Sequence, residues 1–259
     1  MLSTYKMIIA YDGTEYGGWQ IQNNSTTIQA LIQDALHTVL RKSLSVIASG
    51  RTDAGVHALK QVAHFKCSDE LNISKTLLSL NALLPKDIRI LSLESAPPSF
   101  HARFGAHSKI YHYYLYLDPV LDPFLRRYTY RPAHTIDLSL LKEAMHYFVG
   151  THDFTSFANV KEIGSNNERT IHRLELLEQG PWGQNSDKVV CLSFEGSGFL
   201  YKMVRNIVGT LLDICATKLC MSDIPKLFAA RDRRAAGRAA PPQALFLIEV
   251  NYSISSNDV

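Results

Sequence analysis

The sequence contains no long apolar run, and this absence excludes a helical membrane protein. A helix that spans a bilayer needs roughly 18 consecutive apolar residues with few or no charges. The most apolar helical pattern, at 207–216, carries Asp213 in its middle. The first residues (MLSTYKMII) also lack the basic region, apolar segment and cleavage site of a secretory signal. We therefore expect a soluble protein that works in the cytoplasm and has no membrane partner.

Cysteine is also scarce, with only 4 residues in 259. The spacings of Cys67, Cys191, Cys215 and Cys220 match neither a disulfide framework nor a CxxC zinc or redox motif. We therefore expect reduced thiols, most of them buried.

A large excess of charge of one sign is missing as well, because 27 Lys and Arg residues face 24 Asp and Glu residues. A net charge of +3 does not by itself predict binding to nucleic acid. The basic residues are nevertheless clustered, in RRYTYR at 126–131 and in RDRRAAGR at 231–238. Such clusters are either solvated surface loops or contacts for a polyanion.

What is present is an ordinary globular composition, 46% hydrophobic and 20% charged, which is enough to bury a core. The clearest element is a helix at 28–40, where apolar residues recur at helical spacing and Thr26 with Gln29 has the pattern of a capping box. Pro85 ends a second helix. The expected elements of this half are strands at 5–11, 44–48, 61–67 and 88–94 and helices at 28–40 and 73–84, in the order βαββαβ.

The second half repeats this order after Pro97 and Pro98. Its expected elements are strands at 109–117, 170–177, 188–194 and 245–252 and helices at 138–149 and 200–215. The sequence therefore predicts an α+β protein of two tandem ferredoxin-like (RRM-like) units with antiparallel sheets. We expect the domains at 1–105 and 106–259. Because unrelated functions share this fold, the function has to come from particular residues.

The most unusual segment is SGRTDAGVHA at 49–58, between two expected strands. Gly50 and Gly55 bracket Arg51 and Asp53, which favours a tight loop that holds a charged pair at the rim of a cleft. The alternative is a polar connecting turn in which Asp53 caps its own backbone. His57 is left unassigned, since it is equally a packed residue or a catalytic base.

Two further segments carry polar groups in apolar surroundings. Arg205 lies on the flank of the apolar stripe of the helix at 200–215, where a charge needs a partner. That partner is either part of a functional site or an ordinary salt bridge. The strand YHYYLY at 111–116 is either a hydrophobic strand face or a platform on which bases stack.

The segment GRTDAGVHA at 50–58 resembles the signature of the TruA-type tRNA pseudouridine synthases. Other segments resemble the same family and fall in its order: YDGTEYGGWQIQ (11–22), TIQ (27–29), FHAR (100–103), the tyrosine strand at 111, HDFTSF (152–157) and MVRNIVG (203–209). The resemblance extends over about residues 5–252. Lys60 departs from it where glycine is frequent, and Ala239 and Ala244 depart from it where threonine and glycine are usual.

The resemblance implies a pseudouridine synthase fold and the isomerisation of uridine to pseudouridine at positions 38, 39 and 40 of the tRNA anticodon stem-loop. By this match Asp53 is the catalytic nucleophile, Arg205 is its ion-pair partner, and Tyr111 contacts the flipped uracil. No cofactor and no metal is implied, because the isomerisation neither adds nor removes atoms. Spacings typical of metal ligands are also missing from the sequence.

The resemblance also implies how tRNA, the expected partner, is bound. Arg51 is expected to fill the stack that the flipped base leaves. The other residues expected at the substrate are Tyr111, Leu245, Arg126, Arg127 and Arg231. A homodimer with shared RNA-binding clefts is implied as well. The competing interpretations are a non-catalytic RNA-binding module and a metal-dependent phosphoesterase, and the latter needs clustered acidic ligands that are not seen here.

Overall fold

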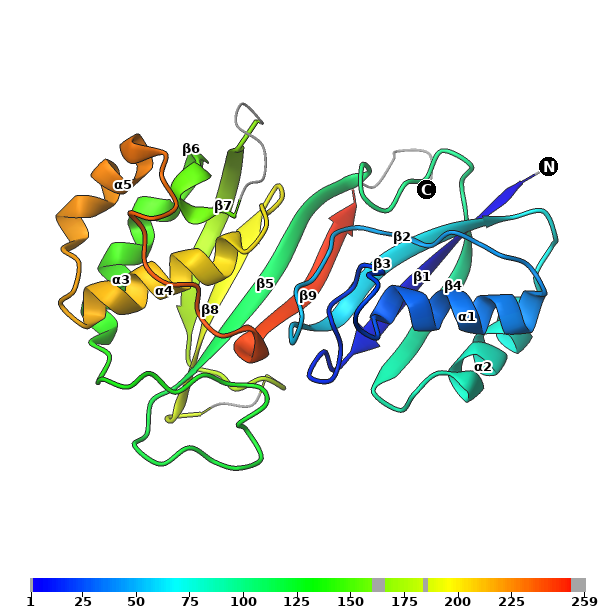
Figure 1. The fold of residues 1–259 in the computed structure, drawn as a ribbon, viewed down its shortest axis with the longest axis horizontal. Coiled ribbons are helices and arrows are strands. Elements are labelled where there is room, and N and C mark those ends of the chain that lie inside the picture. The colour runs from blue at the N-terminus through cyan, green and yellow to red at the C-terminus, as the bar shows by residue number, and fades with distance from the viewer. Residues whose placement is uncertain (1, 160–165, 184–185, 253–259) are drawn as a thin grey trace. The chain divides into compact units, whose positions relative to one another are not determined.

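The structure, a computed structural model, describes residues 2–159, 166–183 and 186–252 (Figure 1). Its contacts divide the chain into two compact units, which are described separately. Unit 1 comprises Met1–His107 and Phe246–Val259, and unit 2 comprises Ser108–Leu245. The last strand therefore groups with unit 1, whereas the sequence assigned it to the second domain. The domain division at 105/106 stays a prediction.

Unit 1 contains the predicted order of strands and helices. Its elements are β1 (Ser3–Tyr11), α1 (Ile28–Leu40), β2 (Ile47–Ala48), β3 (His57–Cys67), α2 (Ile73–Leu83), β4 (Ile88–Ala96) and most of β9 (Leu245–Tyr252). Strand β1 pairs antiparallel with β3 and β4, and β2 pairs antiparallel with β3. Strand β9 joins β3 in parallel, with His57 opposite Phe246.

The core of unit 1 follows from the alternation along β1. Tyr5, Met7 and Ile9 are buried, whereas Lys6 and Ile8 between them are half-buried on the other face. Helices α1 and α2 cover the buried face (Figure 1). Helix α2 ends where predicted, because the residue before Pro85 is driven into extended backbone.

The predicted capping box at the start of α1 is wrong. The N-cap is Thr27, and its side chain makes no capping hydrogen bond. The first two helical N–H groups donate instead to the carbonyls of Gly18 and Trp19, at 3.2 and 3.0 Å. The carboxamide of Gln29 turns away and donates to Val46 O at 2.8 Å. The carbonyls of Gly18 and Trp19, which lie outside the short window of the capping-box pattern, therefore cap the helix instead.

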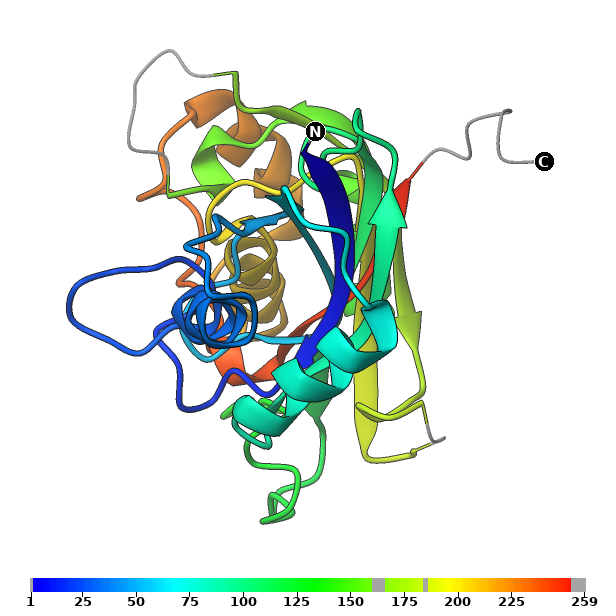
Figure 2. The ribbon, with the colours of Figure 1, turned by 90° about the vertical axis from the view of Figure 1, so that its right-hand side faces the viewer.

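In its described residues, unit 2 consists mainly of antiparallel strands and α-helices. Its elements are β5 (Ala106–Tyr116), α3 (Leu138–Met145), β6 (Gly150–Asp153), β7 (Glu168–Leu177), β8 (Val189–Gly196), α4 (Met203–Cys215) and α5 (Ile224–Ala230). Strand β8 pairs with β5 and β7, and β7 pairs with β6. The helices lie on one side of the strands (Figure 2). The chain is therefore a mixed α+β protein with largely antiparallel pairing.

Several predicted boundaries in the chain differ from the observed ones for local reasons. Helix α4 begins at Met203, not at 200, because Lys202 adopts a left-handed backbone with a φ of 60°. Helix α3 ends at Met145 and continues as one 3-10 turn. Strand β6 and helix α5 are too short to give a periodic signal and were not predicted.

The four cysteines are free thiols, as predicted, but the expectation that most of them are buried is wrong. Cys67 and Cys191 are buried, Cys215 is half-buried and Cys220 is exposed. None of the helices in the described ranges is both long enough and apolar enough to span a bilayer.

Candidate active site

The loop that carries Asp53 connects β2 and β3 in unit 1. It is a tight turn, in which the N–H of Val56 donates to the carbonyl of Asp53 at 3.2 Å. Gly55 has a φ of +77°, which side-chain-bearing residues rarely adopt. Thr52 is buried and Asp53 is half-buried. The glycine therefore has the role predicted for it, which is to close the loop around the carboxylate.

A second loop, residues 12–19, supports the Asp53 loop through two close approaches of backbone to backbone. A Cβ on Gly13 would lie 2.0 Å from Val56 O, and a Cβ on Gly18 would lie 2.6 Å from Thr52 O. Gly18 also has a φ of +94°. The N–H of Trp19 donates to Thr52 O at 3.0 Å. Because only glycine fits at both contacts, the YDGTEYGG segment clamps the backbone on each side of Asp53.

A buried polar network also holds the loop that carries Asp53. Tyr11 and Thr52 share a hydrogen bond of 2.8 Å between their hydroxyls. Gln61 donates to Gly50 O at 2.9 Å and accepts from the Ser49 hydroxyl at 2.7 Å. Burial raises the pKa of Tyr11 to about 12, against the opposing effect of its bonds to Thr52 and Gln61, so its hydroxyl is neutral. Such fully bonded buried networks are rigid.

His57, which the sequence left unassigned, has a packed position. It is 1% exposed, and its Nδ1 accepts the backbone N–H of Gly13 at 3.1 Å. Its ring stacks on Phe246 with centroids 4.4 Å apart. Arg51 is different, since it is exposed and its side chain makes no hydrogen bond or ion pair within the described part of the chain.

In unit 2, helix α4 presents Arg205 at the edge of its buried face, as predicted. Val204 is buried and Arg205 is half-buried. The Nε of Arg205 donates to Ala240 O at 2.7 Å, and the N–H of Ala240 donates to Arg205 O at 2.9 Å. Residues 238–244, called the strap below, are therefore bonded to α4 at both the backbone and the guanidinium of Arg205.

The strap reaches α4 because the helix has a glycine at the crossing. A Cβ on Gly209 would lie 1.6 Å from Arg238 O, which is shorter than any non-bonded contact. Gly237, just before the strap, is also tightly placed: a Cβ on it would lie 2.7 Å from the backbone of Thr210, and its N–H donates to the Thr210 hydroxyl at 3.0 Å. The glycine inside the MVRNIVG motif is therefore explained by close approach of a second backbone.

Asn206, next to Arg205, holds the basic loop that leads to the strap. It is fully buried, and its amide donates to Phe157 O at 2.9 Å. Its carbonyl oxygen accepts from Arg233 at 2.8 Å. Burial lowers the pKa of Arg233. This member of the 231–238 cluster is thus a structural residue, with a fixed protein partner.

The tyrosine strand is β5, and its rings are buried. Tyr111 is 8% exposed and meets Phe199 edge to face, with centroids 5.2 Å apart. Tyr113 is fully buried, and its hydroxyl donates to Pro241 O at 2.9 Å. His112 lies between them and bonds to the Tyr114 hydroxyl at 3.0 Å. Burial of the rings favours the packed strand over an open stacking platform.

His112 makes the free energy of unfolding depend on pH. Burial lowers the pKa of this ring from 6.5 to about 4, so the folded protein keeps it neutral where the unfolded chain takes up a proton. Its contribution is complete above pH 6.5 and is lost as the pH falls toward 4. We expect the wild type to lose about 1 kcal/mol more than His112→Gln between pH 7 and pH 5. Urea unfolding at both pH values measures this, and equal losses would contradict it.

Residues 7–105 and 144–253 match the family model described as tRNA pseudouridine synthase. The chain belongs to the tRNA pseudouridine synthase family. The matched ranges include the Asp53 loop and Arg205. Tyr111, Arg126 and Arg127 lie between the two ranges.

Curated relatives match this synthase over nearly its whole length. It is 51% identical over 252 residues to tRNA pseudouridine synthase A 1 of Protochlamydia amoebophila, with 96% of each chain covered. It is 46% identical over 247 residues to tRNA pseudouridine synthase A of Chlamydia muridarum, with 94% of this chain and 90% of the relative covered. It is 43% identical over 247 residues to tRNA pseudouridine synthase A of an Exiguobacterium species, with 95% of this chain and 97% of the relative covered.

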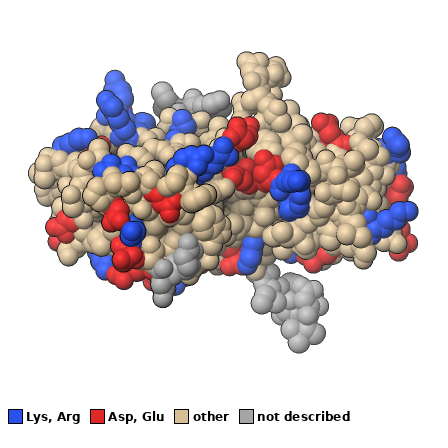
Figure 3. Space-filling view, turned by 90° about the horizontal axis from the view of Figure 1, so that it is seen from below, with Lys and Arg blue, Asp and Glu red and all other residues tan. Residues whose placement is uncertain are grey.

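The other residues that the sequence assigned to substrate binding in this synthase lie at the surface or in the core of unit 2. Arg126 and Arg127 are exposed, and Arg126 also bonds to Pro123 O. Arg231 is exposed but pairs with Asp153 at 3.0 Å. Leu245 is buried. On the face seen in Figure 3, lysine and arginine side chains are interspersed with acidic ones.

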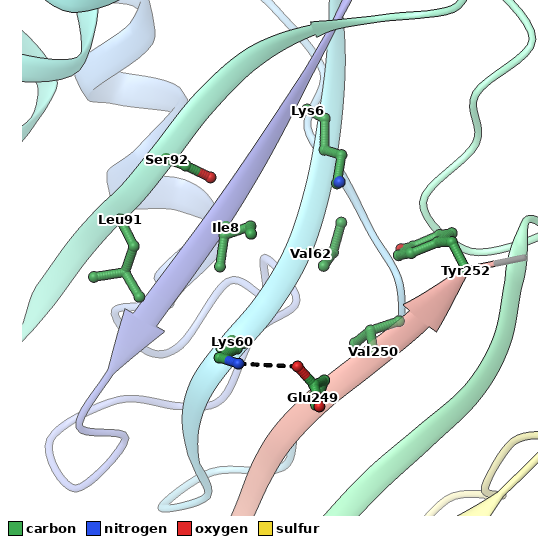
Figure 4. A pocket seen from close by; sticks show the side chains of 9 residues that line it. All are labelled: Lys6, Ile8, Lys60, Val62, Leu91, Ser92, Glu249, Val250 and Tyr252. Carbon is green, nitrogen blue, oxygen red and sulfur yellow. Dashed lines mark hydrogen bonds and ion pairs between the residues drawn. The ribbon is translucent and has the colours of Figure 1, made fainter. Parts of the chain in front are cut away.

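The departure at Lys60 lies away from the Asp53 loop. A groove of about 270 Å³ opens on the strand face of unit 1 that α1 and α2 leave uncovered (Figure 4). Lys60 pairs there with Glu249 at 2.9 Å, and Lys6 pairs with Glu94 at 2.8 Å. None of the predicted site residues lines this groove. Among the described residues of the synthase, no group of three His, Cys, Asp or Glu side chains is placed to hold a metal ion.

Proposed function

We propose that this protein isomerises uridine to pseudouridine in the anticodon stem-loop of tRNA. The observation that carries the proposal is the Asp53 loop, which lies inside the family match and is clamped by Gly13 and Gly18. Rigid support of one loop carboxylate is what positioned nucleophilic catalysis needs. The curated relatives named tRNA pseudouridine synthase A support tRNA as the substrate.

In the proposed reaction the N1–C1′ bond of uridine breaks, the uracil turns over, and C5 bonds to C1′. The proton leaves C5 and N1 gains one, so atoms and charge balance without a co-reactant. Asp53 acts as an anion in one of two ways. It adds to the nucleotide, or it removes a sugar proton to give a glycal.

Arg205 is proposed as the ion-pair partner that keeps Asp53 ionised next to the base, where burial alone would raise the carboxyl pKa. The bond from its Nε to the strap supports this role, because it gives the guanidinium a set direction. Tyr111 is proposed to contact the uracil and assist removal of the C5 proton. Exposed Arg51 is proposed to fill the vacated stack.

Phosphates of the tRNA are proposed to bind at Arg126, Arg127 and Arg231, with Leu245 at the rim of the uridine site. An RNA contact at Arg231 has to compete with Asp153. We also infer a homodimer that acts in the cytoplasm, where tRNA is its substrate. Two tandem ferredoxin-like units are proposed as the fold, supported by the strand order β4-β1-β3-β2 in unit 1.

The direct test uses tRNA transcribed with uridine that carries tritium at C5. Isomerisation releases the C5 hydrogen to water, so we expect tritium release that is proportional to enzyme, with the new pseudouridines mapped to the anticodon stem-loop. Binding of the transcript without tritium release would favour the RNA-binding module. Strand cleavage would favour the phosphoesterase.

A further inference from the structure

Two hydrogen bonds fix consecutive peptide groups of the strap. One runs from the Nε of Arg205 to Ala240 O at 2.7 Å, and the other runs from the Tyr113 hydroxyl to Pro241 O at 2.9 Å. We propose that Tyr113 is a positioning residue for Arg205, acting through this pair of carbonyls. The inference rests on the proposed function, because it concerns the direction in which Arg205 presents its charge.

The sequence of the strap leaves few other ways to hold it. Pro241 and Pro242 have no backbone N–H, so carbonyl oxygens are the groups by which their peptides can be bonded. The neighbouring N–H, that of Ala240, is already given to Arg205 O at 2.9 Å. The Tyr113 hydroxyl is therefore a second anchor, independent of Arg205, one residue further along the strap.

Tyr113 acts here as a donor. Burial raises the pKa of its hydroxyl well above the ordinary value, Tyr130 raises it further, and the positive charge of Arg205 opposes this. A tyrosine that keeps its proton can donate permanently to Pro241 O. Arg205 and Tyr113 donate to consecutive carbonyls, those of Ala240 and Pro241, so both side chains act on the same stretch of the strap.

The consequence concerns which edge of the guanidinium is presented to a carboxylate. An arginine can pair through its Nε and one terminal nitrogen, or through its two terminal nitrogens. Because the Nε of Arg205 donates to Ala240 O, a carboxylate would pair with Arg205 through the edge formed by its two terminal nitrogens. If the Tyr113 hydroxyl is removed, Pro241 O loses its hydrogen bond and the strap holds the guanidinium of Arg205 less firmly in one orientation.

The test compares wild type, Tyr113→Phe, Arg205→Lys and the double variant, in single-turnover pseudouridine formation followed for hours so that slow variants stay measurable. We expect Tyr113→Phe to lower the rate about tenfold and to leave the substrate concentration at half-maximal rate within about twofold, as for loss of one buried hydrogen bond. In the Arg205→Lys protein the same change should have less than about a twofold effect, because the residue acts through Arg205.

The matched control is Tyr114→Phe, which removes the neighbouring hydroxyl, the one that bonds to His112. It should leave the rate within about twofold. An equal tenfold loss from Tyr113→Phe in both backgrounds, or no loss in either, would overturn the proposal.

Hydrogen exchange at Ala240 gives a readout that does not depend on activity. Its N–H bonds to Arg205 O, so we expect it to exchange at least about tenfold faster in Tyr113→Phe and unchanged in Tyr114→Phe. Unchanged exchange in Tyr113→Phe would overturn the proposal. A wild-type protein that makes no pseudouridine would instead refute the proposed function, and the exchange result would still decide whether Tyr113 holds the strap.

Discussion

Replacing Asp53 by asparagine should leave tRNA binding nearly unchanged and reduce pseudouridine formation below detection. Asparagine keeps the size of the side chain but has no negative charge, so it neither adds to the nucleotide nor removes a sugar proton. Binding should survive because phosphate contacts spread over the basic loops supply most of the affinity. Filter binding and tritium release on the same preparation measure the two quantities.

The loop itself should be undisturbed by this substitution, which makes the result interpretable. Gly13, Gly18 and the bonds around Thr52 remain in the variant and continue to support the loop. Asp69→Asn is a suitable control, since Asp69 is an exposed carboxylate of the same unit that pairs with Lys42. It should retain full activity.

Substantial isomerisation by a folded Asp53→Asn protein would show that another residue is the nucleophile. The preparation has to be free of wild-type enzyme and of aspartate regenerated by deamidation. Under the alternative of a simple polar turn, asparagine is an equally good turn residue and the change would be silent. The two interpretations thus predict opposite results in one assay.

Gly209→Ala is expected to have the largest effect among substitutions outside the residues proposed for chemistry. Alanine is a better helix former than glycine by about 1 kcal/mol, so propensity alone predicts stabilisation. The new Cβ would, however, lie 1.6 Å from Arg238 O. Relieving such overlap costs about 1 to 3 kcal/mol or more. We expect a net loss of about 2 kcal/mol in the free energy of unfolding.

The same substitution should also reduce activity at least about a hundredfold in protein that is still folded, because it pushes the strap away from Arg205 and breaks the bond to Ala240 O. Gly198→Ala is the matched control. Its Cβ would meet only side-chain atoms of Arg169, at 3.8 Å and beyond, so stability and activity should stay near wild type. A fully active, equally stable Gly209→Ala protein would show that the strap does not bear on catalysis.

Much of the fold could be predicted from local patterns. Helices α1 and α2 have strong apolar periodicity, and Pro85 marks the end of α2, so both were found within a residue or two. The capping box at Thr26 and Gln29 was wrong because loop carbonyls at 18 and 19 reach the helix first. The capping-box rule considers only residues at the helix start, so it could not show that carbonyls about ten positions earlier would accept these N–H groups.

The candidate site shows the same limit. Asp53 and Arg205 could be proposed only because each lies in a segment that resembles the family's motifs, since their own residue patterns also fit a polar turn and an ordinary salt bridge. Gln61 and Tyr113 were missed, because one reads as an ordinary strand residue and the other as an ordinary core tyrosine. Their roles arise from contacts across 11 and 128 positions of sequence. The glycine inside α4 was a usable signal, since a helix interior tolerates glycine mainly where another backbone comes close.

Strand β9 gives the protein an unusual order of assembly. It pairs in parallel with β3 at His57 and stacks Phe246 on that ring, yet 188 residues separate these two positions. The sequence of unit 2 is thus inserted between the two parts of unit 1. During synthesis, β3 can pair with β9 only after the whole of unit 2 has been made. Such long-range closure is slow, so the start of β3 at His57 should be among the last parts of unit 1 to gain its full set of strand partners.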